Sequence, residues 1–449
     1  MNTLHTTRRS FLQTTAAAGC LAGMPAVHTS AAPKEASDKL NIAIIGAGGR
    51  GAANTRGVQS ENIVALCDVN GKVLQQAGER FPDAKRYRDW REVIDDRRVD
   101  AVVISTADHH HALAAIAAMR AGKHVYCEKP LAHTVQEARV MQEEYKKRRD
   151  RIATQMGTQI HATENYRRIV ELVRAGAIGP VREAHVWCSR TIRPLEQVVL
   201  PEEPIPDYFA WDVWLGPAAE RPYNEKYWKG GNLNWNRRWD FGNGVLGDMG
   251  SHLIDLPFWA LQLKSPTTVA SEGPAPDPYA CPPWQVVTWE HPARSGNAAL
   301  AVPVKVIWYH GPEGMRRRAA AIQPRVGNDT DISRWGIGVA FVGDDGVLVG
   351  DYGRHLLSPS KKFARYERPE KSIPPSPGHY REWITACKTG SPTLCHFDYS
   401  GTLIEHNLLG NVAHRAGQKI TWDAQRMSTG SARRAVEFLS KAYRDGWTL

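Results

Sequence analysis

The sequence lacks long hydrophobic runs, closely spaced cysteines and a strong excess of one charge. No apolar stretch in its 449 residues approaches the roughly 20 residues that a membrane-spanning helix needs. Its seven cysteines include no CxxC pair, so their spacing neither indicates a zinc knuckle nor demands a disulfide framework. Hydrophobic residues make up 42% and charged residues 23%, the balance of a soluble globular protein of about two to three domains.

Basic residues exceed acidic ones, but they do not form a patch. The sequence has 57 Lys and Arg against 47 Asp and Glu, and the two signs are often adjacent, as in the run from Asp95 to Arg98. Such mixing is typical of a solvated surface. It favours a small-molecule partner over nucleic acid and gives no reason to expect stable membrane insertion.

Residues 1–32 resemble a twin-arginine signal peptide. Arg8 and Arg9 precede a Phe-Leu pair, a weakly apolar stretch over residues 14–27 and several small residues. We therefore expect a periplasmic or otherwise exported protein, and we exclude this segment from the fold. A disordered basic N-terminus is the alternative interpretation, and Cys20 leaves a lipid anchor open as a less favoured one.

The segment after residue 39 has the pattern of a dinucleotide-binding βαβ unit. An apolar, β-branched run over residues 40–45 leads into a glycine-rich turn. In such a turn glycines permit a sharp bend, a close approach of the pyrophosphate, and tight packing of helix on strand, while helix amides bind the phosphates. The predicted cofactor-binding residues of this turn are Gly46, Gly48, Gly49, Arg50 and Gly51.

Asp68 predicts which dinucleotide is bound. It ends a second apolar run over residues 63–67 and follows Gly46 by 22 positions. A carboxylate there can accept hydrogen bonds from both ribose hydroxyls and would repel a 2′-phosphate. NAD is therefore expected as the cofactor rather than NADP, with an ordinary strand-ending turn acid as the alternative for Asp68.

Strands and helices continue to alternate up to about residue 157. A capping box at Thr134 and Glu137 opens one of the predicted helices. The pattern predicts an α/β fold with an N-terminal Rossmann domain, a doubly wound parallel sheet over residues 33–157. The further strands are expected at 99–105, 124–127 and 152–158, and the helices at 112–120 and 134–149.

The pattern changes in the remainder of the chain. A helix over 163–174 precedes an alternating segment over 181–187, and long stretches rich in Pro and Trp follow. Alternation of this kind suits an open, mainly antiparallel sheet. We expect an α+β domain over residues 158–449 that binds substrate and carries the contacts of a homo-oligomer.

Three motifs together resemble the Gfo/Idh/MocA oxidoreductases. They are the glycine-rich turn, Glu-Lys-Pro at residues 128–130, and Gly-Asp-Met-Gly-Ser-His at residues 247–252, and the segment 403–411 extends the resemblance. The resemblance implies a Rossmann domain followed by an open-sheet domain, with a nicotinamide cofactor between them. It also implies oxidation or reduction of a sugar or polyol.

By this resemblance Lys129, Asp248 and His252 take the positions of the family's catalytic trio and contact the substrate. Oxidising a secondary alcohol requires a base for the hydroxyl proton and a donor to the developing oxyanion, and an imidazole and an ammonium suit these tasks. Asp248 lies one helical turn before His252 and could orient it or bind a sugar hydroxyl. The alternatives are a solvated lysine, a helical ion pair, or a metal site that includes Asp255.

The segment from Ser105 to His111 matches the family's segment that passes the cofactor, with Ala107 in place of the usual Pro. The resemblance implies cofactor contacts for Thr106, His111 and Glu128, as well as for Lys129. The three successive histidines suggest a metal, but neighbours at a helix start point about 100° apart. We therefore expect no metal.

Five tryptophans precede the motif at residues 247–252. Flat rings beside amide and guanidinium donors suit a sugar, and Trp239 is the predicted substrate contact. Ordinary aromatic packing is the alternative for about half of them. The five are Trp211, Trp214, Trp228, Trp235 and Trp239.

Export affects the expected reaction cycle, because little free NAD is available outside the cytoplasm. We expect NAD to stay bound and the hydride to be returned, either to a second sugar or to the same one. The latter route provides an alternative activity, NAD-dependent glycoside hydrolysis by transient oxidation, elimination, hydration and re-reduction.

Overall fold

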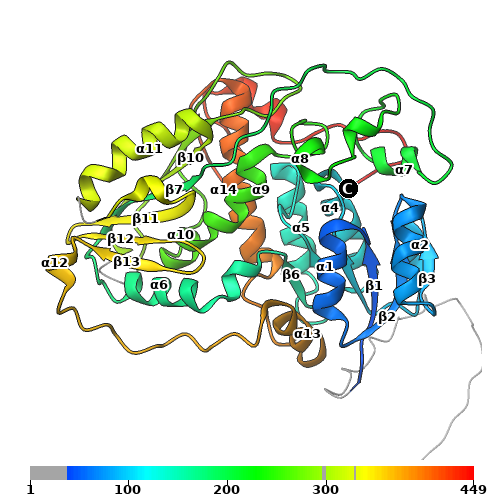
Figure 1. Cartoon of the computed structure of the whole chain (residues 1–449), viewed down its shortest axis with the longest axis horizontal. Coiled ribbons are helices and arrows are strands. Elements are labelled where there is room, and N and C mark those ends of the chain that lie inside the picture. The colour runs from blue at the N-terminus through cyan, green and yellow to red at the C-terminus, as the bar shows by residue number, and fades with distance from the viewer. Residues whose placement is uncertain (1–37, 296–299, 328–329) are drawn as a thin grey trace, which may run out of the picture. The chain divides into compact units, whose positions relative to one another are not determined.

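The computed structural model describes residues 38–295, 300–327 and 330–449. The predicted signal peptide, with Arg8, Arg9 and Cys20, lies outside these ranges. Two sheets organise the described chain, and one buried apolar cluster includes residues of both, from Ala43 to Phe341. Figure 1 shows the long helix α14 (Phe397–Ala416) between them.

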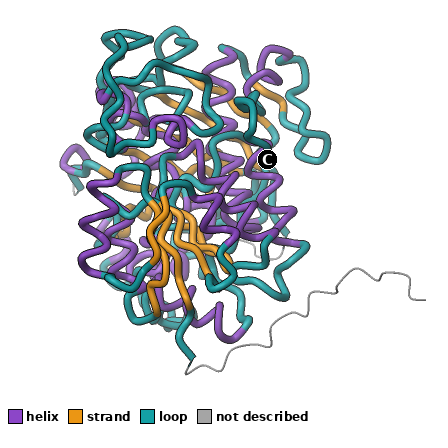
Figure 2. Tube along the Cα trace, turned by 90° about the vertical axis from the view of Figure 1, so that its right-hand side faces the viewer, coloured by secondary structure: helices purple, strands orange, loops and turns teal. Residues whose placement is uncertain are grey.

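The first sheet is parallel throughout and has the strand order β3-β2-β1-β4-β5-β6. Its central strands are apolar because helices cover both faces, as Figure 2 shows for the orange strands and purple helices. The strands are β1 (Asn41–Ile45), β2 (Asn62–Cys67), β3 (Lys85–Tyr87), β4 (Ala101–Ile104), β5 (His124–Cys127) and β6 (Thr154–Met156). The helices are α1 (Gly49–Val58), α2 (Gly71–Arg80), α3 (Trp90–Asp95), α4 (Asp108–Arg120) and α5 (Val135–Lys146).

This sheet confirms the predicted Rossmann fold. Chain order reverses between β1 and β4, and the carboxyl ends of strands at such a point are where α/β sheets bind ligands. The capping box is present, with Thr134 accepting from the Glu137 amide at the start of α5. Strand β3 was not predicted, since it is a three-residue edge strand that begins with two exposed basic residues.

The second sheet has the order β13-β12-β11-β7-β10-β9-β8-β14. All of its pairings are antiparallel except the one between β7 and β10, so the expected mainly antiparallel sheet is confirmed. The strands are β7 (Val181–Cys188), β8 (Thr268–Glu272), β9 (Gln285–His291), β10 (Val304–His310), β11 (Ile337–Gly343), β12 (Val347–Gly350), β13 (His355–Ser358) and β14 (Ile420–Thr421).

Helices cover both faces of this second sheet. Along β10, Val306 and Trp308 enter the cluster shared with the Rossmann sheet, whereas Ile307 and Tyr309 pack in a second cluster with Ile322 of α11. The remaining helices are η1 (Gln159–Ala162), α6 (Glu164–Arg174), α7 (Trp211–Leu215), η2 (Glu225–Tyr227), α8 (Asn232–Trp235), α9 (Gly244–Leu253), α10 (Asp255–Ala260), α11 (Gly311–Val326), η4 (Ile332–Arg334), α12 (Ser360–Phe363), α13 (His379–Thr389) and η5 (Arg433–Phe438).

The end of the chain returns to the Rossmann sheet. Trp383 of α13 is fully buried in a cluster with Ile42 and Ile44 of β1, and α14 packs along α5. Residues beyond 157 therefore complete the core of the nucleotide-binding half, and the two predicted domains share apolar packing.

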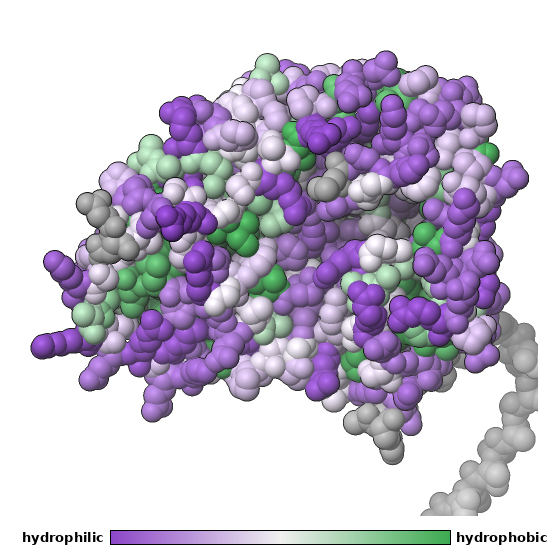
Figure 3. Space-filling view, viewed as in Figure 1, coloured by the Kyte–Doolittle hydropathy of each residue, from purple (hydrophilic) through white to green (hydrophobic). Residues whose placement is uncertain are grey.

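The described cysteines are all buried and unpaired, so they act as packing residues. Within the described ranges no helix has the length and apolarity needed to cross a bilayer. Figure 3 shows hydrophilic residues over most of one face, with hydrophobic ones in scattered patches. The cysteines are Cys67, Cys127, Cys188, Cys281, Cys387 and Cys395.

Candidate active site

The glycine-rich turn joins β1 to α1 at the switch point of the Rossmann sheet. Gly46 has a φ of +83°, and a Cβ there would lie 2.6 Å from the Ser105 carbonyl oxygen. A Cβ on Gly51 would lie 1.7 Å from the carbonyl oxygen of Gly46, so only glycine lets α1 pack this closely. The turn also has space beside Gly49, where a Cβ would meet nothing within 4 Å. These features fit the pyrophosphate of a dinucleotide at the start of α1.

Asp68 reaches back to this turn from the end of β2. Its carboxylate accepts from the amides of Ala47 (2.9 Å), Gly48 (3.2 Å) and Asn70 (2.9 Å). Burial raises the pKa of the carboxyl, and the three amides oppose that rise. Because a carboxylate offers about four acceptor positions, capacity remains for ribose hydroxyls. This arrangement fits NAD.

Glu128 braces the turn from the end of β5. Its Oε1 atom accepts from Arg50 Nε (3.0 Å), Asn54 Nδ2 (3.0 Å) and Gln159 Nε2 (2.9 Å). The residue is 4% exposed, and a Cβ on Gly157 would collide with its carboxyl group. Glu128 thus fixes the Glu-Lys-Pro segment against α1, while the half-exposed Arg50 side chain borders the turn.

The predicted contacts Thr106 and His111 lie together at the start of α4. His111 bridges the Pro130 carbonyl (2.7 Å from Nδ1) and the Thr106 carbonyl (3.0 Å from Nε2). Burial lowers the pKa of His111, so its neutral ring donates to one carbonyl at a time. This contact ties the segment after β4 to the segment that carries Lys129.

The other two histidines of α4 serve packing contacts, and the Nε2 atoms of both lie near the carbonyl oxygen of Trp214. His109 Nε2 lies 3.0 Å from the Trp214 carbonyl oxygen and Nδ1 lies 3.3 Å from that of Phe241. His110 accepts a hydrogen bond from Trp90 Nε1 at 3.2 Å. Among the residues with described coordinates, no group of three His, Cys, Asp or Glu side chains could hold a metal ion.

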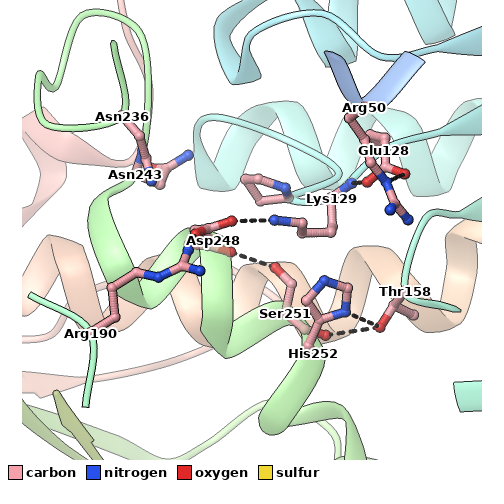
Figure 4. A network of polar contacts seen from close by, with 12 residues as sticks. Arg50, Glu128, Lys129, Thr158, Arg190, Asn236, Asn243, Asp248, Ser251 and His252 are labelled. Carbon is pink, nitrogen blue, oxygen red and sulfur yellow. Dashed lines mark hydrogen bonds and ion pairs between the residues drawn. The ribbon is translucent and has the colours of Figure 1, made fainter. Parts of the chain in front are cut away.

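Lys129 and Asp248 form the centre of the candidate site. The Lys129 ammonium contacts Asp248 Oδ1, and the guanidinium of Arg190 contacts Oδ2 (Figure 4). Burial alone would raise the pKa of the Asp248 carboxyl, but the two cations outweigh it and lower that pKa. Asp248 therefore stays ionised and holds the Lys129 ammonium in place.

His252 lies one turn further along α9, on the same side as Asp248. Burial lowers the pKa of its imidazole to about 3, and the nearby Lys129 ammonium contributes to that shift. The ring is neutral at pH 7 and can accept a proton. Figure 4 shows Lys129 and His252 side by side, although Lys129 follows β5 of the first sheet and His252 belongs to α9.

Thr158 favours one tautomer of His252. Its Oγ1 lies 3.2 Å from the Ser251 carbonyl oxygen and 3.3 Å from His252 Nδ1. The hydroxyl has one hydrogen, and the carbonyl can only accept. When Thr158 donates to Ser251, it accepts from the Nδ1–H of His252, and the lone pair of His252 is then on Nε2.

Sequence reasoning missed three residues of this site. Arg190 follows β7, Thr158 follows β6, and the ring of Tyr352 lies 6.4 Å from that of His252 in an edge-on arrangement. The Tyr352 hydroxyl is buried and has no hydrogen-bond partner among the residues that the structure describes. Arg190 lies shortly after the predicted strand 181–187, Thr158 is the last residue of the predicted strand 152–158, and these positions were the only available signal.

The tryptophans fall into two groups. Trp211 and Trp214 pack with Phe209 in a buried aromatic cluster, and Trp228 and Trp235 pack against it partly buried, as the packing alternative predicted. Trp239 is 7% exposed, and its Nε1 donates to the Asp277 carbonyl oxygen at 3.1 Å. It lines a cavity whose lining does not include Lys129, Asp248 or His252.

Two family profiles match the chain. Residues 40–156 match the oxidoreductase family domain described as an NAD-binding Rossmann fold, and residues 190–296 match the C-terminal alpha/beta domain of the same family. The chain belongs to the Gfo/Idh/MocA family of oxidoreductases. Residues 40–156 are the family's NAD-binding Rossmann domain, in agreement with the expected cofactor.

Curated relatives match over part of their length. Inositol 2-dehydrogenase of Salmonella typhimurium is 32% identical over 153 residues, which cover 32% of this chain and 45% of the relative. Levoglucosan dehydrogenase of Pseudarthrobacter phenanthrenivorans is 35% identical over 113 residues, which cover 23% of this chain and 29% of the relative. The chain thus spans less than half the length of these curated relatives.

Solved structures extend the likeness of fold to most of the chain. A levoglucosan dehydrogenase in complex with NADH and levoglucosan has a TM-score of 0.55 at 17% identity, covering 85% of this chain and 99% of its own. GenD2 from gentamicin A biosynthesis, in complex with NAD, has a TM-score of 0.57 at 18% identity, and the match covers 88% of this chain and 99% of GenD2. At these identities the likeness concerns the fold.

Proposed function

We propose that this protein is an NAD-dependent oxidoreductase that transfers a hydride to or from a secondary hydroxyl of a sugar, glycoside or polyol. One observation carries the proposal: the Lys129 ammonium and the neutral His252 imidazole lie side by side at the carboxyl end of the Rossmann sheet. The relatives that match part of this chain are named as dehydrogenases of inositol and levoglucosan, which supports the same substrate class.

In this reaction the chain's residues handle the proton and the charge on oxygen. His252 Nε2 accepts the hydroxyl proton, since Thr158 engages Nδ1. The Lys129 ammonium donates to the oxygen as it becomes an oxyanion, and Asp248 keeps that ammonium oriented. Bound NAD supplies the hydride acceptor in one direction and the hydride donor in the other.

Arg190 and Tyr352 complete the proposed substrate surroundings. Arg190 contacts the second oxygen of Asp248, so that this carboxylate is held between two cations. The unpartnered Tyr352 hydroxyl offers a hydrogen bond to a neighbouring hydroxyl of the substrate. A polyhydroxylated ring has a second hydroxyl beside the reacting one, whereas a simple alcohol has none.

The test uses the whole chain, stripped of nucleotide and reloaded with NAD. A panel of sugars and polyols that includes myo-inositol and levoglucosan is added, and the absorbance of reduced nicotinamide is followed. At least one member is expected to reduce NAD in the wild type and not in His252→Asn. If no member reduces NAD faster in the wild type than in that variant, the proposal fails. Release of an aglycone without net oxidation would favour the hydrolase alternative.

We further propose that the protein is exported in folded form by the twin-arginine route with NAD retained. The paired arginines at the N-terminus support this, as does the low supply of free NAD outside the cytoplasm. An Arg8→Lys, Arg9→Lys variant is expected to remain in the cytoplasm, while exported wild-type protein carries NAD. A fully active but nucleotide-free exported protein would contradict retention, and gel filtration would test the expected homo-oligomer.

A further inference from the structure

A cavity with several polar lining residues lies outside the candidate active site. Its volume is about 360 Å³, which suits a small organic molecule. His133 of the Glu-Lys-Pro loop and Asn243 at the start of α9 line it, so it borders the two segments that carry Lys129 and Asp248. Other lining residues that the argument uses are Trp239, Asp240, Arg415 and Lys441.

Arg415 of α14 contributes a cation without an acidic partner to this cavity. Its guanidinium is held between two rings, with its central carbon 5.0 Å from the Trp239 ring and 4.3 Å from the Phe438 ring. Its Nε atom is buried and has no hydrogen-bond partner, and across the described ranges no carboxylate forms an ion pair with the group. Burial lowers the pKa of Arg415, which means that a bound anion would relieve the cost of its charge.

The other internal charges of the cavity are already balanced. Lys441 Nζ pairs with Glu137 Oε1 at 3.0 Å and lies 2.8 Å from His133 Nδ1. Burial and the charge of Lys441 lower the pKa of His133. Asp240 pairs with Arg221 through its Oδ2 atom. The Glu437 side chain also lines the cavity, but it is exposed and forms no ion pair with Arg415 among the described residues.

We propose that this cavity binds a small organic hydroxy acid, with its carboxylate held by Arg415. A guanidinium presents a planar pair of donors that matches a carboxylate, and a buried donor without a partner is costly. The Oδ1 atom of Asp240, for which the described residues supply no donor, can accept from a ligand hydroxyl. The site is separate from the catalytic residues, so the inference goes beyond the proposed oxidoreductase function.

The test measures binding of sodium gluconate and sodium lactate to the whole chain by isothermal titration calorimetry. D-Glucitol, which resembles gluconate but has no charge, is the control ligand. Binding is compared among the wild type, Arg415→Met, Lys129→Met and Arg316→Met. Met can fill the space between the two rings, and Arg316→Met removes an exposed arginine on α11 as the matched control.

At least one of the two acids is expected to bind to the wild type, to Lys129→Met and to Arg316→Met alike. Its affinity should fall at least about tenfold in Arg415→Met, since a charge-assisted pair of hydrogen bonds is lost. Retained binding in Lys129→Met separates this result from any failure of the proposed activity, because that variant is not expected to turn over.

The proposal is overturned if neither acid binds to the wild type, or if Arg415→Met binds it as tightly as the wild type does. Binding that Lys129→Met abolishes and Arg415→Met retains would assign the acid to the catalytic site and would also overturn it. If Arg415→Met does not fold, Arg415→Lys keeps the charge without the planar donor pair. It is expected to weaken binding several-fold, and unchanged binding would count against the proposal.

Discussion

Two pairs of a histidine and an aspartate, His252 with Asp248 and His161 with Asp255, occupy different environments. On α9, Asp248 contacts Lys129 and Arg190, while His252 contacts Thr158 and is partly exposed. The second pair joins Asp255, at the start of α10, to His161 of η1.

In the second pair, Asp255 Oδ2 contacts His161 Nδ1 at 2.8 Å, and Tyr399 donates to Oδ1 at 2.7 Å. Both members are almost fully buried, and His161 stacks on Trp259 with ring centroids 3.9 Å apart. Direct contact between imidazole and carboxylate therefore marks the structural pair. The candidate catalytic pair is distinguished by cations beside the carboxylate and by a partly exposed histidine.

The largest effect is expected from breaking the buried pair. Asp255→Ala should lower the free energy of unfolding by about 3 kcal/mol, because it leaves two buried polar groups without a partner. Urea denaturation monitored by circular dichroism measures this change. Turnover per folded molecule should remain near the wild-type value, and a change in turnover without destabilisation would contradict the distinction.

Changing His252 or Lys129 of the candidate catalytic site should have the opposite outcome. His252→Asn and Lys129→Met are each expected to lower the rate of hydride transfer at least about a hundredfold, since each removes a group that acts on the reacting oxygen. Unfolding midpoints and NAD affinity should change little, as fluorescence titration with NAD would show. Near-normal turnover in either variant would refute its assignment.

Acid should destabilise the protein through its buried histidines. Burial lowers the pKa of His110 and His310 to about 4 and of His379 and His406 to about 3. Between those values and about 6.5 the unfolded chain binds protons that the folded chain does not, so stability falls as pH falls. Each such histidine should cost roughly 2 kcal/mol at pH 5 relative to pH 8. A urea midpoint that is the same at both pH values would contradict this.

The smallest effect tests the positioning role of Thr158. Thr158→Val should reduce turnover about tenfold, because His252 loses the partner that selects its tautomer, and leave NAD affinity unchanged. Thr158→Ser keeps the hydroxyl and should restore most of the rate. Equal loss in both variants would indicate a packing role instead.

The sequence was sufficient to predict the Rossmann half because its signals are local. A glycine-rich turn, an acid at a strand end and a capping box each occupy a short segment, and all three lie where predicted. β3 escaped prediction because its residues are few and polar. The packing of Trp383 against β1 escaped it because nothing near that residue in the chain indicates its distant partner.

The candidate site was predictable only in part, for the same reason. Lys129, Asp248 and His252 belong to two recognisable motifs, and Figure 4 shows them together. Arg190 and Thr158 belong to no motif and reach the site through β7 and β6. Asp248 was expected to orient His252 or to bind a sugar hydroxyl, and in the structure its two oxygens contact Lys129 and Arg190.

The most direct test of the central claim is a double-mutant cycle on single-turnover hydride transfer. Wild type, Lys129→Met, His252→Asn and the double variant are mixed with the sugar or polyol that reduces bound NAD fastest. If the ammonium and the imidazole act on one oxygen, the double variant should be little slower than the slower single variant. Losses that multiply, as they would for two independent sites, would contradict the account.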